Sequence, residues 1–349
     1  MTAVSSTAPD VQAVIAGRRR RARRRTVVVI VLAAVVAALF ATSIMVGSTF
    51  YGPDVLIRVL LGEQVPGASF SIADRRLPRA AMAVLVGVAF GMAGATFQTL
   101  LRNPLASPDI IGVSFGASAA AVIGIVFFSV SGLALSALAL GGALTTALAI
   151  YLLSIRGGFA GTRLILIGIG LAAMLQSIVT YALSRAAAWD LQSAMRWLTG
   201  SLNSASAESL TPLALAAVVL VPLLALQSRS LHALRIGDDV AAALGVKVDR
   251  TRLALILGAV ALLAFATAAA GPIAFVAFMA GPIAARLVGP SSSPLVPAGL
   301  VGAVLVLAAD LVGQYALPTV YPVGVITGIL GAPYLIALLI RTNRTGGSL

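Results

Sequence analysis

The sequence predicts an all-α integral membrane protein that crosses the bilayer with ten transmembrane helices. Of its 349 residues, 60% are hydrophobic and only 10% are charged, and the mean hydropathy is +1.05. A soluble protein has roughly 25% charged residues, so this chain has too little polar surface to cover a body in water. Composition therefore excludes a soluble enzyme and a nucleic-acid-binding module. The absence of cysteine also excludes disulfides, thiolate metal sites and thiol nucleophiles.

The first expected helix follows a run of seven arginines at residues 18–21 and 23–25. Such a run could bind nucleic acid or anionic lipid, but directly before a span it is typical of a positive-inside topology signal. The apolar segment 26–47 is too long for the core of a signal peptide, and no A-x-A cleavage site closes it. We therefore predict an arginine-rich cytoplasmic tail, 1–25, and a retained first transmembrane helix.

Nine further apolar segments are separated by polar residues, glycine and proline. With the first they define a domain at 26–340, followed by a cytoplasmic tail at 341–349. The segment 187–201, which contains Trp189 and Trp197, is predicted as an interfacial helix rather than a span. The ten predicted spans are 26–47, 79–100, 110–129, 133–155, 163–184, 208–227, 251–270, 273–288, 294–313 and 323–340.

The charge distribution supports an even number of spans, with both termini in the cytoplasm. In the ten-span arrangement, eighteen of the 24 basic residues lie on the cytoplasmic side and six on the outer side. Acidic residues divide almost evenly between the two sides. An arrangement with nine or eleven spans would spread the basic residues over both sides, whereas the positive-inside rule requires them to be concentrated on the cytoplasmic side.

Signatures of catalysis and of ion coupling are weak. Residues 112–116 read G-x-S-x-G, but that motif needs a preceding strand and a histidine partner, and the single histidine, His232, lies in a distant loop. The single lysine, Lys247, is not part of a phosphate-binding loop. We predict no catalytic residue, no metal site and no bound cofactor, which leaves a membrane hydrolase as a remote alternative. An ion-coupled secondary transporter stays the nearer one, although Asp310 is the only acidic residue within an apolar span.

The largest cytoplasmic insertion, 231–250, is expected to form a short surface helix. Gly237 ends one element, Asp238 is a suitable N-cap, and Gly245 is placed to end the helix that begins there. A plain connector is the alternative interpretation of this loop.

Several motifs, in order and in register, resemble the FecCD-type permeases. These are the membrane subunits of ABC importers for iron-siderophores, haem and vitamin B12. The match runs from about Arg75 to Ile340 and implies the fold of the vitamin B12 importer permease, a type II ABC importer. The motifs are Arg-Leu-Pro-Arg at 76–79, Gln98, Arg-Asn-Pro-Leu-Ala-Ser-Pro at 102–108, the glycine-flanked segments 112–117, 237–245 and 271–276, Ala-Asp at 309–310, Pro-Val-Gly at 322–324 and Gly-Ala-Pro at 331–333.

The resemblance implies roles for particular residues. The loop 237–245 matches the coupling helix that docks on a separate cytoplasmic ATPase dimer, to which ATP and magnesium bind. Arg76 and Arg79 match outer arginines that pair with glutamates of an extracytoplasmic substrate-binding protein. The expected coupling residues are Gly237, Asp238, Ala241, Leu244 and Gly245, with Ala241 as the natural contact, and the expected residues of a translocation path or gate are Gln98, Asn103, Gly112 and Asp310.

Three departures from the family pattern affect the expected partners. Ile283 stands where the family has histidine, Gln314 where it has an outer arginine, and Val320 where it has glutamate. A non-identical sister subunit could supply the missing charges, so we favour a heterodimer with a second permease over a homodimer.

The implied function is ATP-driven import of a ferric siderophore across a bacterial cytoplasmic membrane, with cobalamin or haem as alternative cargo. The expected partners are the ATPase dimer, the second permease, the binding protein and membrane lipid, and no nucleic acid.

Overall fold

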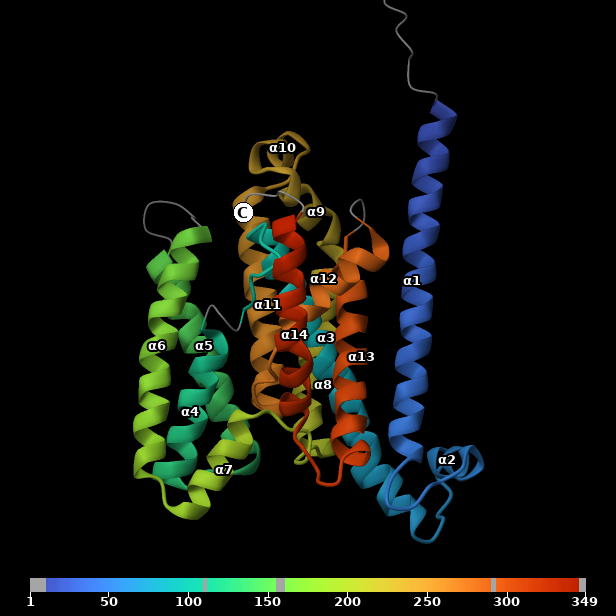
Figure 1. Ribbon diagram of the computed structural model, residues 1–349, viewed down its shortest axis with the longest axis vertical. Helices are drawn as coiled ribbons and strands as arrows, with labels where there is room; N and C mark the ends of the chain where they lie inside the picture. Colours follow the sequence, from blue (N-terminus) through green and yellow to red (C-terminus); the bar gives the residue numbers. More distant parts are fainter. Residues whose placement is uncertain (1–10, 109–111, 155–160, 290–292, 345–349) are drawn as a thin grey trace, which may run out of the picture.

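The computed structural model describes residues 11–108, 112–154, 161–289 and 293–344, and every regular element in these ranges is a helix (Figure 1). The all-α prediction is therefore confirmed for the described residues. In chain order the elements are α1 Val11–Met45, α2 Pro53–Leu60, the π-helix η1 Phe70–Arg76, α3 Leu77–Leu100, α4 Val113–Phe128, α5 Gly132–Ser154, α6 Gly161–Arg185, α7 Ala188–Leu198, α8 Ala207–Leu226, α9 Ser228–Ile236, α10 Asp238–Ala243, α11 Val248–Ala270, α12 Val276–Val288, α13 Leu295–Leu311, the π-helix η2 Val312–Ala316 and α14 Val323–Arg344.

Each predicted span coincides with one helix, but the helices differ in length. Eight helical segments in the described part of the chain are long and apolar enough to cross a membrane. The two shorter ones are α4 and α12, with 16 and 13 residues, which extend only about 24 and 20 Å against a hydrocarbon core of about 30 Å. Each follows non-helical backbone, which the structure describes at 101–108 and at residue 112 before α4, and at 271–275 before α12. The predicted spans 110–129 and 273–288 thus began too early, and residues 109–111 lie outside the described part.

The first helix is longer than the sequence predicted. α1 begins at Val11 and continues through the arginine run without a break, so its 35 residues extend about 52 Å. Residues 11–25 of the predicted tail are therefore helical and continuous with the first span, and their place in the cytoplasm stays a prediction. Arginine is a good helix former, and Arg24 donates its Nε and Nη2 hydrogens to the carbonyl oxygens of Leu287 and Arg286 at 2.9 and 3.1 Å. These bonds fasten α1 to the last turn of α12, whose carbonyls lack partners within the helix.

The core of the molecule is α3, which α11, α12 and α13 surround. Small residues allow the backbones of α3 and α13 to touch: a Cβ atom placed on Gly87 would lie 2.5 Å from the Cα of Ala303, and one on Gly302 would collide with the carbonyl oxygen of Gly87. Gly94 faces the carbonyl of Ala277 in α12 in the same way. Close packing of small faces is how helices associate in lipid, where burial from water gives no drive.

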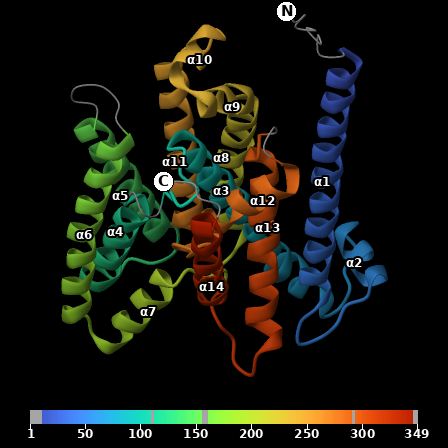
Figure 2. The same cartoon turned by 45° about the horizontal axis from the view of Figure 1, so that its top comes forward.

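A second group of helices, α4, α5, α6 and α7, packs beside this core and contacts it largely through α5 and α11. Figure 2 shows the two groups side by side. The predicted interfacial helix at 187–201 corresponds to α7, which joins α6 to the rest of the chain.

Two ends of the bundle carry different elements (Figures 1 and 2). The α10 end holds α9 and α10, the start of α1 and the end of α14. The α2 end holds α2, η1, α7 and η2. Neither α2 nor η1 is predicted by hydropathy, because a membrane span needs about 20 apolar residues and α2 has eight residues.

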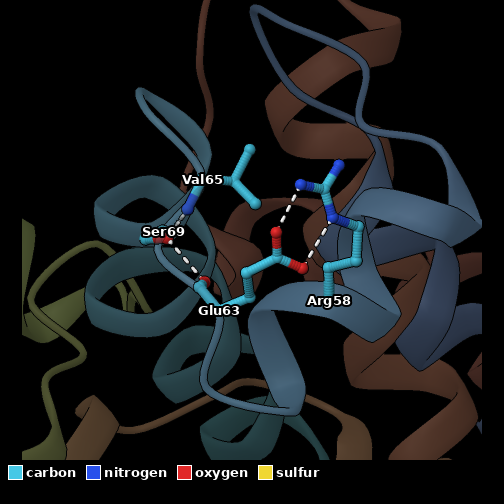
Figure 3. A network of polar contacts seen from close by, with 4 residues as sticks. All are labelled: Arg58, Glu63, Val65 and Ser69. Carbon is cyan, nitrogen blue, oxygen red and sulfur yellow. Dashed lines mark hydrogen bonds and ion pairs between the residues drawn. The ribbon is translucent and has the colours of Figure 1, made fainter.

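The connection that contains α2 has its own polar network (Figure 3). Arg58 donates Nε to Oε2 of Glu63 at 2.7 Å, and Val65 donates its backbone N–H to Oγ of Ser69 at 2.8 Å. The hydrogen bond from Arg58 lowers the pKa of the Glu63 carboxyl. These bonds fold the turn between α2 and η1.

Candidate functional site

The predicted coupling loop forms two short helices, α9 and α10, that project from the bundle (Figure 1). Gly237, with φ +147°, is the N-cap of α10, so the prediction of Asp238 as the N-cap is wrong. The end of α10 agrees with the sequence. Gly245 adopts φ +84° and donates its N–H to Ala242 O, while Val246 donates to Ala241 O at 3.0 Å. This pair of bonds is a Schellman motif, which requires a left-handed residue where Gly245 stands.

Three large apolar side chains are exposed at α10 and directly beside it: Ile236 at the end of α9, Val240 within α10 and Leu244 just after it. Leu244 is exposed to 67%. We call these three residues the α10 patch. Ala241 is 0% exposed and packs inward, so the expectation that Ala241 is the contact for a partner is wrong. Exposed apolar patches on a surface that meets water mark sites of protein interaction.

Two arginines from other elements hold α10 through Asp238. Arg102 donates Nη2 to Asp238 Oδ1 at 3.0 Å and to the carbonyl of Leu234 at 3.1 Å. Arg252, in the first turns of α11, donates Nη2 to Asp238 Oδ2 at 2.8 Å. The carboxylate therefore connects α10 both to the residue that follows α3 and to α11.

Arg102 occupies an unusual backbone conformation. Its φ is +50°, and it ends α3 in a second Schellman motif, in which Asn103 N–H donates to Gln98 O at 3.1 Å. A left-handed residue with a side chain costs roughly 1–2 kcal/mol, which glycine avoids. Asn103 accepts a bond from Leu105 N–H through Oδ1 at 2.8 Å, so it supports this turn, and its predicted role in a path stays a prediction.

Gln98, one turn before Arg102, lies at the wall of a cavity of about 330 Å³. Its side chain is largely buried and donates Nε2 to the carbonyl of Phe278 in α12 at 3.0 Å. Gly281 leaves the space that the amide occupies, because a Cβ there would overlap Gln98 Oε1. The cavity opens at the α10 end and is lined by Ala95, Gln98, Thr99, Arg102, Pro104, Arg235, Gly281, Pro282, Ala285 and Pro294.

At the α2 end, Arg79 and Asp310 pair with each other. Arg79 donates Nε to Asp310 Oδ2 at 2.8 Å and Nη2 to Oδ1 at 2.7 Å. The side chain of Asp310 is 8% exposed and that of Arg79 is 22% exposed. The pair joins the start of α3 to the end of α13.

Arg76 is also bound within the chain. It donates to the carbonyl oxygens of Ile44, Met45 and Thr49 at 2.8 to 3.0 Å, and its guanidinium lies 4.7 Å from the ring centre of Tyr51. It thereby caps the end of α1. Both arginines predicted to meet a binding protein thus have partners in this chain.

A cavity of about 530 Å³ at the α2 end brings three arginines together. Arg75 is exposed and lies 5.4 Å above the ring of Phe70, and it shares the cavity wall with Arg76 and Arg79. Gln314, one of the departures noted above, also lines it and donates to Asn203 at 3.1 Å. Because Asp310 balances the charge of Arg79, the positive charge that the wall offers to acidic partners comes from Arg75 and Arg76.

Gly112 begins α4 with φ +99°, and a Cβ there would lie 3.0 Å from Gly168 O in α6. Only glycine suits this position, both in backbone conformation and in the space available. These two requirements are enough to explain why residue 112 is glycine, and its predicted role in a translocation path stays a prediction.

Within the described residues, no group of three or more His, Asp or Glu side chains could hold a metal ion. His232 lies on α9, and burial lowers its pKa, with Arg235 lowering it further. It is therefore neutral near pH 7.

The sequence alone assigned no role in this site to Arg102 or Val240. Arg102 and Asp238 are 136 positions apart, so spacing could not pair them. Val240 and Leu244, large apolar residues in a loop with several charged residues, were the signal that could have identified the α10 patch.

The chain is similar to known proteins over most of its length. The model of the FecCD transport family matches residues 32–341. The chain is 41% identical to the ferric enterobactin transport system permease protein FepG of Escherichia coli over 82% of this chain and 87% of that one. It is 35% identical to FepD, a second permease protein of the same transport system, over 88% of this chain and 92% of that one.

The fold is also found among solved structures. An inward-facing structure of a metal-chelate type ABC transporter superposes with a TM-score of 0.78 and 26% sequence identity, and the match covers 90% of this chain and 98% of that one.

Proposed function

Because the chain belongs to the FecCD transport family, we propose that it is the permease subunit of an ATP-driven ABC importer for a ferric siderophore. The observation that carries the proposal is the family match over almost the whole chain, combined with relatives that are named as siderophore permeases. The chain is an integral membrane protein of a non-catalytic family, and ATP hydrolysis is assigned to a separate subunit.

The α10 end is proposed to face the cytoplasm and an ATPase dimer. The arginine-rich half of α1 and the basic residues Arg102, Arg235, Lys247 and Arg252 gather at this end, in keeping with the positive-inside rule. The α10 patch supplies the apolar contact surface, with Gly237 and Gly245 setting the ends of α10. Asp238 and Ala241 hold α10 in place from within the chain.

We further propose that all ten apolar helices cross the bilayer, with both termini in the cytoplasm. α4 and α12 are short, and the non-helical segments beside them complete the crossing. Irregular backbone is tolerated at membrane depth where protein buries it, and Ala106, Ser107, Ile273 and Val276 are all buried. The transport domain is proposed to be 26–340, in a bacterial cytoplasmic membrane.

The α2 end is proposed to face the binding protein. Its cavity is lined by three arginines, of which Arg75 is the exposed one. Carboxylates of a binding protein would be steered there by charge.

A second, non-identical permease is the proposed partner in the membrane. FepG and FepD are both permease proteins of one ferric enterobactin transport system, and this chain resembles both. A sister subunit would also supply the outer charges that this chain lacks at Gln314 and Val320.

The proposal is tested by uptake in a strain that lacks this gene. We expect this strain to lose uptake of a defined ferric siderophore. The wild-type gene should restore the uptake, and ATP depletion should then abolish it. Uptake that survives ATP depletion and collapses with the proton gradient would identify a secondary transporter instead. Loss of cobalamin uptake with intact ferric siderophore uptake would contradict the proposed cargo and identify cobalamin instead.

A further inference from the structure

The link between α10 and the cavity at Gln98 runs through one short stretch of chain. Gln98, in the last turn of α3, bonds α12, and Arg102, just past the end of α3, bonds α10. Arg102 therefore both bonds α10 and lines the cavity, one turn from Gln98.

The backbone of Arg102 indicates that its side chain matters. A helix that ends in a Schellman motif favours glycine at this position, and the chain uses glycine for it at Gly245. At residue 102 it uses arginine with φ +50° instead. Unfavourable backbone conformations persist where the surrounding structure over-determines them, and they concentrate at functional sites.

The side chain of Arg102 connects the end of α3 to both α9 and α10. One nitrogen, Nη2, bonds the last turn of α9 at Leu234 O and the first residue of α10 at Asp238 Oδ1. Asp238 is held from its other oxygen by Arg252 of α11, whose side chain is largely buried. The carboxylate thus bonds one arginine just past the end of α3 and one arginine within α11.

We propose that Arg102 and Asp238 are positioning residues that transmit movement of α10 to the end of α3 and hence to the cavity lined by Gln98. The inference rests on the proposed function, since it assumes that an ATPase moves α10. The pair is not part of the α10 patch, so its loss leaves the ATPase bound while nucleotide turnover no longer moves the spans.

The decisive variant is Arg102→Gly, because it separates transmission from stability. Glycine relieves the left-handed conformation, so the folded chain is expected to be as stable as the wild type or more so. A merely structural residue would then leave transport unchanged. Transmission predicts that cargo transported per ATP hydrolysed falls about fivefold or more, with ATPase association retained.

Three companion variants complete the design. Asp238→Asn is expected to give the same loss, and the double variant no further loss, because the two residues act as one unit. Arg102→Lys keeps a positive charge within reach of Asp238 and is expected to keep most of the coupling. Arg229→Gln, at an exposed position of α9, removes a positive charge at the same end and is expected to transport as the wild type does.

The experiment uses proteoliposomes that contain the complete importer, with ATP hydrolysis and ferric siderophore uptake measured together. A wild-type ratio of transport to hydrolysis in Arg102→Gly overturns the inference, and so does loss of the ATPase from that variant. A wild-type complex that hydrolyses ATP without importing any ferric siderophore would instead refute the proposed function, and the transmission role with it.

Discussion

Arg79 and Asp310 form a bidentate ion pair, 2.8 and 2.7 Å long, between the start of α3 and the end of α13. Asp310 is therefore the partner of an arginine rather than an isolated carboxylate in a span. This arrangement removes the strongest sequence argument for an ion-coupled mechanism. It also means that Arg79 serves the fold of this chain, whatever it contributes to docking.

Breaking this pair from one side is expected to destabilise the protein. Arg79→Ala leaves a largely buried carboxylate without its partner, at a cost on the order of 3 kcal/mol. The double variant Arg79→Met/Asp310→Leu removes both charges and should recover much of that loss. Unfolding midpoints in detergent test this, and a double variant that is no more stable than Arg79→Ala would contradict it.

Docking of the binding protein is expected to depend on Arg75. Arg75→Glu reverses an exposed charge at the cavity wall, so the association rate should fall roughly tenfold at low salt and differ less at high salt, where charges are screened. Arg185→Glu is the matched control, because Arg185 is exposed at the same end of the bundle but does not line the cavity. Association kinetics at several ionic strengths decide the matter, and equal effects of the two variants would count against a specific site.

ATPase association is expected to depend on Leu244 and not on Ala241. Leu244→Asp places a charge in the α10 patch and should abolish co-purification with the ATPase while the chain keeps its unfolding midpoint. Ala241→Arg forces a long cation into a site with no exposed surface, so it should lower the midpoint by the equivalent of several kcal/mol. Retention of the ATPase by Leu244→Asp would show that the patch is not the contact.

Close backbone packing makes Gly94 sensitive to the smallest side chain. A Cβ at Gly94 would overlap Ala277 O in α12, so Gly94→Ala should destabilise the fold by roughly 1–3 kcal/mol. Gly141→Ala is the control, since a Cβ there meets no atom within 4 Å and alanine favours the helix by about 0.5–1 kcal/mol. Thermal unfolding of the two variants should shift in opposite directions.

Acidification is expected to weaken α9. Burial lowers the pKa of His232 in the folded chain, so below its unfolded value of about 6.5 the unfolded state binds more protons than the folded state. The stability that a neutral His232 allows is thus present above about pH 6.5 and decreases as the pH falls below it. Hydrogen exchange of α9 at neutral and acidic pH measures the effect, and His232→Gln should remove it.

Hydropathy was sufficient to locate all ten apolar helices, because an apolar segment long enough for lipid leaves little choice of structure. Their ends were less predictable. α1 continues into the arginine run because bonds from Arg24 to α12, more than 260 positions away, hold it there. α4 and α12 begin late because Gly112 and Phe275 adopt left-handed conformations, which composition does not reveal.

Site residues were predictable as segments more than as contacts. Residues 237–245 were correctly located as a short helix that ends at Gly245, although its N-cap is Gly237 and not Asp238. Which of its side chains faces outward depends on how α10 rests on α9 and α11. Arg102 and Arg79, which pair with Asp238 and Asp310, lie 136 and 231 positions away from them, and a single sequence carries no signal for such pairs.

The glycine contacts between α3 and α13 restrict how this molecule can change shape. Side chains that interdigitate can exchange rotamers and let two helices slide, but backbone atoms in direct contact have no such freedom. α3 and α13 must therefore move together as one rigid body. Any rearrangement has to be absorbed at contacts built from side chains, such as those between the α4–α7 group and α11.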